Sequence, residues 1–283
     1  MADALAPFDL LPDELVLAIL RKSVFFHIWN KHNFLINTIG NISARFRRLA
    51  ADPTFWKDWN GVIQITGWGI QAKERQLKMV IDTFLGPGIE SLELITGDSD
   101  VWGDKPLISS QDLTLLAEKC PKLTHLNITG FKMESWPLFG PPWSVEELKF
   151  AYVTMNSKAF NNVELHVGLP DIRVFEMDSC KYEGKHPIKL PDMSKCENLE
   201  AVGLFRSAVM PGKTAKKKGK GVSKGKCPFP EDLETLTICG GTFHKFDTDF
   251  FKTRLMYCDV HIGDYSASSD SWPSWSDAEY FSD

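Results

Sequence analysis

Several features of membrane and secreted proteins are missing from this sequence of 283 residues. No run of apolar residues approaches the length of about 18 that a membrane-spanning helix needs. Asp3, and no basic residue, precedes the first apolar stretch, which disfavours a secretory signal peptide. The six cysteines are scattered without a CxxC pair, which favours reduced thiols over a disulfide framework. The sequence therefore predicts a cytoplasmic or nuclear protein that does not contact a membrane.

Motifs of common enzyme classes are missing as well. There is no glycine-rich phosphate loop, GxSxG, HExxH or kinase signature. One metal-like set occurs, Cys239-x4-His244 with Cys258-x2-His261. Cys258 and His261 fall in a predicted strand, where residues three apart face opposite ways. We therefore expect no catalytic residues, no metal and no cofactor.

The first sixty residues contain two amphipathic helical patterns joined by an irregular bridge. Pro12 stands where the first helix should begin, and Asp13 and Glu14 follow in the first turn, where the helix dipole favours carboxylates. Asp52-Pro53 should end the second helix, because the residue before a proline is disfavoured in the α region. A unit this short makes a poor core of its own. Apolar residues at intervals of three and four mark both helices: Leu15, Val16, Ile19 and Leu20, then Ile42, Phe46 and Leu49.

These features resemble an F-box. The resemblance rests on Leu-Pro-Asp-Glu-Leu at 11–15, on the helix over 42–49 and on Asp-Pro-Thr-Phe-Trp at 52–56. The middle departs from the family pattern, because Asn33-Phe34-Leu35 only weakly echoes the usual Asp-Leu pair and Ser43 replaces a frequent Cys. The resemblance implies a three-helix domain over residues 1–59 that docks on a Skp-type adaptor and, through it, on a cullin.

By motif position, the resemblance also implies which side chains contact the adaptor. Trp56 and Trp59 are instead expected to hold the helical domain against the next part of the chain. An unrelated helical cap on a larger domain is the alternative. The implied adaptor-binding residues are Leu11, Pro12, Leu15, Ile19, Ile42, Phe46 and Leu49.

From residue 60 onward one short phrase recurs, with apolar residues at its first, fourth and sixth positions. Successive copies are 22 to 34 residues apart, and two of the intervals are 27. Segments around Ile63 and Ile262 are candidates for a first and a last copy. The six clear copies are Ile89-Leu92-Leu94, Leu123-Leu126-Ile128, Val145-Leu148-Phe150, Ile172-Phe175-Met177, Leu199-Val202-Leu204 and Leu233-Leu236-Ile238.

This phrase resembles the leucine-rich repeat, and Cys180 stands where that pattern has Asn or Cys, here as a small buried side chain. The expected fold is therefore α/β: an F-box followed, over 60–262, by an irregular leucine-rich-repeat solenoid with a curved parallel sheet. Return helices are predicted over 72–85 and 109–120, and loops or single turns elsewhere. An ordinary α/β layer fold is the alternative.

Alternate residues of a strand face opposite ways, so the residues between the apolar positions should face solvent. Stacked repeats present such a surface to partners, and we expect it to bind a protein substrate. Phe205 is the expected hydrophobic anchor, with burial against an adjacent loop as the alternative. The candidate substrate-binding residues are Glu93, His125, Asn127, Lys149, Glu176, Asp178, Phe205 and Thr237.

A lysine- and glycine-rich insertion at 211–227 interrupts the repeats. It contains no acidic residue and almost nothing to bury, which predicts a disordered loop. It is interpreted as a solvated insertion, with a nuclear-import signal or a patch for acidic partners as alternatives. Nucleic-acid binding is disfavoured, because the run has no aromatic residue for base stacking and no Arg.

The segment 263–283 has the opposite character, being acidic and rich in serine and tryptophan. We expect a disordered tail. Its opposite charge and its aromatic residues suggest that it lies against the lysine-rich loop or the open strand surface as a removable competitor.

Taken together, these resemblances imply a non-catalytic substrate-recognition subunit of an SCF-type cullin–RING ubiquitin ligase. One alternative is an F-box-containing scaffold that recruits the adaptor without delivering substrates for ubiquitination. Another is a repeat-only interaction protein whose helical start merely caps the repeats, since stacked repeats need a cap at each end.

Overall fold

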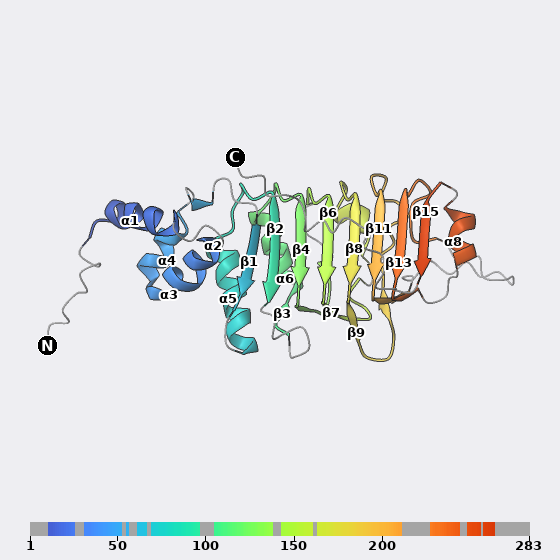
Figure 1. Ribbon diagram of the computed structural model, residues 1–283, viewed down its shortest axis with the longest axis horizontal. Helices are drawn as coiled ribbons and strands as arrows, with labels where there is room; N and C mark the ends of the chain where they lie inside the picture. The colour runs from blue at the N-terminus through green and yellow to red at the C-terminus, as the bar shows by residue number, and fades with distance from the viewer. Residues whose placement is uncertain are drawn as a thin grey trace.

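The computed structural model describes residues 11–25, 31–52, 55–56, 61–66, 69–96, 105–137, 143–160, 163–210, 227–243, 248–255 and 257–263. The chain is an α/β protein with helices at its start, followed by a large parallel sheet that extends away from them along the long axis of the molecule (Figure 1). Among these residues, no helix combines the length and apolarity that crossing a membrane requires. Residues 211–226 of the predicted insertion, residues 264–283 of the predicted tail, Trp59 and His244 lie outside the described residues.

The start of the chain is more helical than expected. The elements are α1 (Asp13–Phe25), α2 (Lys31–Phe34), the π-helical turn η2 (Leu35–Ile39), α3 (Gly40–Ile42) and α4 (Ala44–Ala50). The prediction of an irregular bridge is thus wrong for residues 31–41, which are helical and bury Leu35, Ile36 and Ile39. Ser43 is extended, and its hydroxyl accepts a hydrogen bond from the Phe46 N–H (3.2 Å), so α4 begins two residues later than predicted.

Eight strands form one sheet in the order in which they occur along the chain, and every neighbouring pair is parallel. The middle apolar residues of the six phrases lie side by side in register, so the predicted parallel ladder is confirmed. The segments around Ile63 and Ile262 add the first and last strands. The strands are β1 (Gly61–Ile65), β2 (Ser91–Thr96), β4 (His125–Thr129), β6 (Glu147–Ala151), β8 (Val174–Asp178), β11 (Ala201–Phe205), β13 (Thr235–Cys239) and β15 (Asp259–Gly263).

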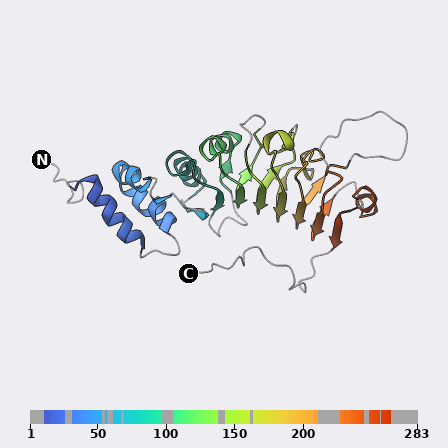
Figure 2. The ribbon, with the colours of Figure 1, turned by 90° about the horizontal axis from the view of Figure 1, so that it is seen from above.

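The connections return along one side of this sheet (Figure 2). They contain α5 (Ile70–Thr83), α6 (Ser110–Lys119), α7 (Leu165–Gly168) and α8 (Thr248–Arg254). The predicted capping of α6 is present as a full capping box between Ser109 and Asp112.

Short strands that the sequence did not predict form two smaller parallel sheets next to the large one. Each is only two or three residues long, which leaves too little sequence for an alternating pattern to be recognised. The first sheet contains β3 (Leu107–Ile108), β5 (Lys132–Met133), β7 (Thr154–Asn156) and β9 (Lys181–Glu183), and the second contains β10 (Ile188–Lys189), β12 (Ala208–Met210) and β14 (Thr242–Phe243).

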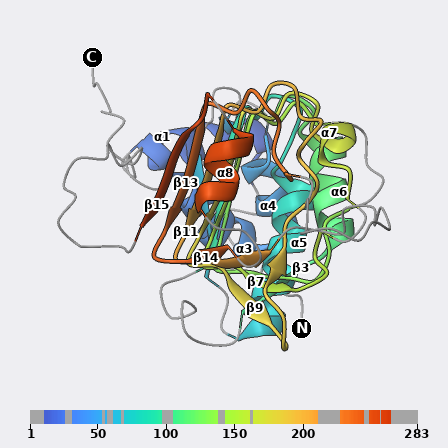
Figure 3. The same ribbon diagram turned by 90° about the vertical axis from the view of Figure 1, so that its right-hand side faces the viewer.

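The core fills the space between the large sheet and its return segments. Second and fourth residues of the central strands are buried and their neighbours are partly exposed, as the period of two requires. Phe150 and Phe175 meet edge to face, with ring centroids 6.2 Å apart, and both contact Phe160 in the same way. The opposite side of the sheet is covered by no described helix or strand (Figure 3).

Each inner strand from β4 to β13 is followed by one residue with positive φ: Gly130, Tyr152, Ser179, Arg206 or Gly240. The N–H of that residue donates to the last carbonyl of the next strand, at 2.7 to 3.1 Å. Three of the five are not glycine, and this conformation is uncommon for them. The repeated hydrogen bond ties each turn to its neighbour and fixes where the strands end.

Candidate functional site

The first candidate surface lies at the helical end of the molecule: Leu15 and Ile19, one helical turn apart, form an apolar stripe on α1, and Ile42 is exposed on α3. Their exposed fractions are 53%, 40% and 58%, which is unusual for large aliphatic side chains. Val16 and Leu20, on the other side of α1, are buried in the core. α1 therefore has more apolar surface than the described part of the chain covers.

The beginning of α1 is fixed to α4 by a small ionic cluster. The carboxylate of Asp13 accepts hydrogen bonds from Arg45 (Nη2 to Oδ1, 2.8 Å) and from Arg48 (Nη2 to Oδ2, 2.7 Å). The same Arg45 guanidinium donates to the Leu11 carbonyl. The hydrogen bond from Arg45 is the main reason why the pKa of Asp13 lies below its usual value. Arg45 thus orients the Leu11-Pro12 step, where Pro12 is exposed and Leu11 is partly exposed.

Two of the seven residues implied for adaptor binding are not on this surface. Phe46 and Leu49 keep only 7% and 5% of their surface exposed and belong to the core. The expectation that α4 presents them outward is corrected: its apolar side faces inward and is covered by the surrounding helices. The exposed set is therefore Leu15, Ile19 and Ile42, with Pro12 and part of Leu11 beside it.

The helical region is joined to the first strand by specific contacts. The Asn33 side chain accepts from the Gln64 N–H (2.8 Å) and donates to the Val62 carbonyl (3.3 Å), along the outer edge of β1. Trp56 donates to the Ala50 carbonyl (2.9 Å), and its ring lies 5.4 Å from that of Phe84, at the end of α5. Trp56 therefore holds the helices against the sheet region, as predicted.

The second candidate surface is the open face of the large sheet, formed in β1 by Val62 and Gln64 and in the other seven strands by the first, third and fifth residues. Register places Glu93, Asn127, Lys149 and Glu176 next to one another in one row across β2, β4, β6 and β8. The row continues through Gly203 of β11 and Thr237 of β13. Residues far apart in sequence thus form one continuous polar surface.

Charged side chains in this row pair with their neighbours. Lys149 lies 3.1 Å from Glu176 and 3.9 Å from Glu147, and His125 lies 3.4 Å from the other oxygen of Glu147. Asn127 donates to Glu93 (2.7 Å). Burial raises the pKa of Glu93, and the charge of Lys149 partly offsets the rise. Solvated pairs of this kind contribute little to stability, so their charges remain available to a partner.

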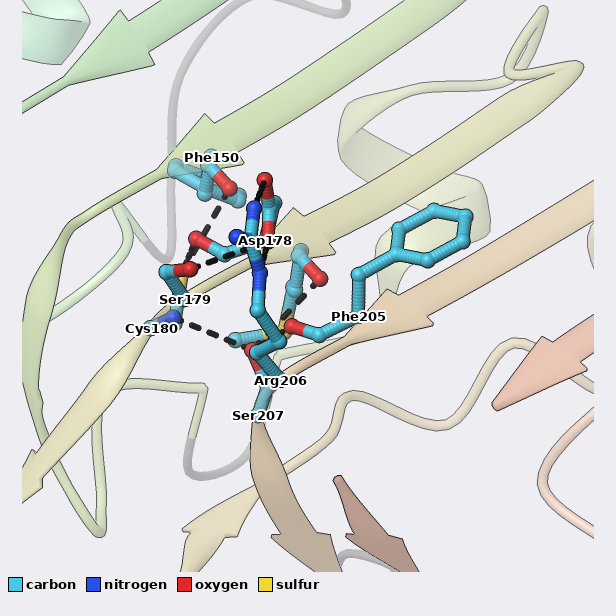
Figure 4. A network of polar contacts seen from close by, with 8 residues as sticks. Phe150, Asp178, Ser179, Cys180, Phe205, Arg206 and Ser207 are labelled. Atoms are coloured by element: carbon cyan, nitrogen blue, oxygen red, sulfur yellow. Dashed lines mark hydrogen bonds and ion pairs between the residues drawn. The ribbon is translucent and has the colours of Figure 1, made fainter. Parts of the chain in front are cut away.

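Asp178, at the end of β8, is bound by the residue that follows β11. Arg206 donates through Nε (2.9 Å) and Nη2 (2.5 Å) to the two carboxylate oxygens, and the Ser179 hydroxyl donates at 3.0 Å (Figure 4). Beneath this pair, the Cys180 N–H donates to the buried hydroxyl of Ser207 (3.0 Å). Burial raises the pKa of the Cys180 thiol to about 12, which leaves it a structural thiol.

Phe205 and Thr237 differ in exposure. Phe205 is partly exposed on the open face, where its ring lies over Gly203. A Cβ atom at position 203 would be only 2.6 Å from Cε2 of that ring. Thr237 is 6% exposed, so the expectation that it faces solvent is corrected: it lies on this face next to Gly203, and its neighbours cover it.

Sequence reasoning missed three residues of this surface: Glu147, Gly203 and Arg206. Glu147 stands two residues before Lys149 in the same phrase, and the alternation of strand residues could have identified it. Gly203 is marked only by lacking a side chain. Arg206 lies after its strand, where alternation no longer applies, and no signal in the sequence connects it with Asp178.

The described residues contain no group of three or more metal-binding side chains. Neither a scan against models of protein families nor a search of curated proteins finds a match for this chain.

Proposed function

We propose that the protein is a substrate-recognition subunit of an SCF-type cullin–RING ubiquitin ligase, in which the helical start acts as an F-box and the later strands are irregular leucine-rich repeats forming a solenoid. In this role α1 and α3 dock on a Skp-type adaptor, which links them to a cullin. The open sheet face holds a protein substrate. The protein itself performs no chemistry and works in the cytoplasm or the nucleus.

The single observation that supports this proposal best is the exposure of the aliphatic side chains of Leu15 and Ile19 on α1, together with that of Ile42 on α3. Burying the half of each side chain that is still exposed is favourable by roughly 1 kcal/mol each. The stripe and the open sheet face belong to separate regions of the chain, so one partner can occupy each without displacing the other (Figure 1). Bringing two partners together is what a receptor subunit requires.

A second candidate is a repeat-only interaction module whose helices serve as the cap of the first strand. The bonds of Asn33 to the edge of β1 favour this role, because exposed strand edges need such cover. A cap has no need for an uncovered apolar stripe, however. Adaptor binding therefore separates the two functions.

The test is a binding measurement between the full chain and a purified Skp-type adaptor. The variant Leu15→Ala/Ile19→Ala/Ile42→Ala is expected to lose at least tenfold in affinity while it remains folded, as its thermal unfolding transition should show. The matched control is Val167→Ala on α7, an aliphatic side chain that is 61% exposed elsewhere, and it should bind as the wild type does. Undiminished adaptor binding by the triple variant would exclude the F-box role.

A second measurement separates a ligase receptor from an adaptor-binding scaffold. Proteins that co-purify with the wild-type chain after proteasome inhibition are compared with those that co-purify with Leu11→Ala/Pro12→Ala. A receptor is expected to have bound proteins whose turnover slows in the variant. Bound proteins with unchanged turnover indicate the scaffold.

A further inference from the structure

Carboxylates outnumber basic side chains on the open face of the sheet. Arg206, which follows β11 and is bound to Asp178, is a cation of this face in addition to Lys149. The face therefore attracts positively charged partners and repels phosphate groups. Among the described strand residues of this face, the carboxylates are Glu93, Glu147, Glu176, Asp178 and Asp259, the histidines are His125 and His261, and the only lysine is Lys149.

Phe205 supplies the only phenyl ring among the described strand residues of the open face. Its ring is held over Gly203, and a Cβ there would also be only 2.8 Å from Cγ of Glu176. The aromatic ring and the stem of Glu176 thus meet over one glycine. One side of the ring rests on the sheet, and Phe205 as a whole is partly exposed. An aromatic surface with a carboxylate next to it is therefore presented to solvent.

This pairing has a specific chemical preference. The face of an aromatic ring attracts a cation by its quadrupole, and a guanidinium also stacks on it. A carboxylate beside the ring can hydrogen-bond to the same cation. The ion pair of Glu176 with Lys149 is partly exposed to water, so exchanging or sharing it costs little.

Resting on the substrate-binding role proposed above, we infer that the open sheet face binds a basic protein segment, with an arginine or lysine side chain on Phe205 beside Glu176. A second cation of the segment lies near Glu147, one strand from Glu176 in the sheet. The substrate class is therefore a protein with an exposed, arginine- or lysine-containing stretch. A nucleic acid does not fit, because its phosphates would face the carboxylates.

The test is a positional-scanning library of acetylated, amidated decapeptides, screened against the immobilised full chain at 150 mM salt. The wild type is expected to select Arg or Lys at one position or more. A labelled peptide carrying the selected residues is then titrated. Phe205→Leu, which keeps apolar bulk without the ring, should weaken its binding about three- to fivefold.

Further variants separate the ring from its surroundings. Phe205→Tyr should retain binding, and Gly203→Ala should weaken it because the added methyl displaces the ring. Glu176→Gln should weaken binding severalfold, whereas Glu118→Gln on α6, on the other side of the sheet, should not. Melting temperatures show that each variant is folded, and Glu176→Gln remains informative where Phe205→Leu does not fold.

Selection of acidic or purely apolar residues, or of none, overturns the inference. So does Arg or Lys selection that is unchanged in both Phe205→Leu and Glu176→Gln. Failure of the proposed ligase role is read separately, from adaptor binding. Adaptor binding with apolar peptide selection refutes only this inference, whereas basic selection without adaptor binding refutes only the ligase role.

Discussion

The helical region and the large sheet treat their apolar residues differently. In the sheet, the core-facing residues of the inner strands are almost completely buried, as Leu94, Phe150 and Phe175 illustrate. In the helical region, Leu15, Ile19 and Ile42 remain about half exposed. Both regions use the same kinds of side chain, so the difference lies in how their neighbours are arranged.

A strand in a stacked sheet divides its residues cleanly. Alternation places most apolar residues on one side, where strands on both flanks and the return segment cover them, and Phe205 is an exception on the open face. The helix α1 carries apolar residues around more of its circumference, and the chain covers only the side with Val16 and Leu20. Spare apolar surface therefore accumulates at the helical end, while the sheet presents polar and charged groups. The two regions thus offer two different binding chemistries.

The largest expected effect on stability comes from truncating a buried apolar side chain of the sheet, compared with truncating an exposed one of the helical region. Phe175→Ala should destabilise the protein by about 3–5 kcal/mol, because it opens a cavity among Phe150, Phe160 and other core residues. Ile19→Ala, on the exposed stripe, should change stability by less than about 1 kcal/mol. Urea unfolding of both variants is the measurement. Equal losses of unfolding free energy in the two variants would mean that Ile19 is buried in solution.

A smaller effect tests the turns that align the strands. Gly241, in the turn after β13, has no space for a side chain, since a Cβ there would overlap the Ser207 backbone, 2.7 Å from its nitrogen. Gly241→Ala should therefore cost about 1–3 kcal/mol. The control is Gly86→Ala, after α5, where nothing lies within 4 Å of a Cβ. It should be neutral or slightly stabilising, because alanine restricts the unfolded chain. Similar losses of stability in both variants would contradict the expected overlap between a side chain at position 241 and the Ser207 backbone.

The sequence could predict the sheet because its information is local and repeated. Each phrase specifies a strand through its own alternation, and parallel register follows from stacking like on like. Features set by contacts between phrases were missed. The positive φ of Arg206 depends on a carbonyl of the next strand, at Cys239, and the covering of Thr237 depends on what surrounds it in the assembled sheet. Likewise, Phe46 and Leu49 repeat at helical spacing whether they face a partner or the core, and only the fold decides which.

The smallest expected effect concerns Glu93, an open-face carboxylate whose pKa is raised by burial. Because burial favours its protonated form in the folded state, it adds stability below its unfolded pKa, and this stability is lost as the pH rises through the folded value. Glu93→Gln keeps an acceptor for Asn127 and removes the charge. It should therefore be more stable than the wild type at pH 7.5, by at most about 1 kcal/mol after solvent screening, with the difference vanishing near pH 4.

Thermal unfolding of both proteins between pH 4 and pH 8 measures this difference, with Glu118→Gln as the matched loss of one charge from an exposed site on α6. A Glu93→Gln variant that is less stable at pH 7.5 would show that Lys149 and Asn127 compensate the burial of the carboxylate. In that case the open face would resemble an ordinary solvated surface. A gain confined to neutral pH would instead show that the carboxylate of Glu93 is already partly desolvated before any partner binds.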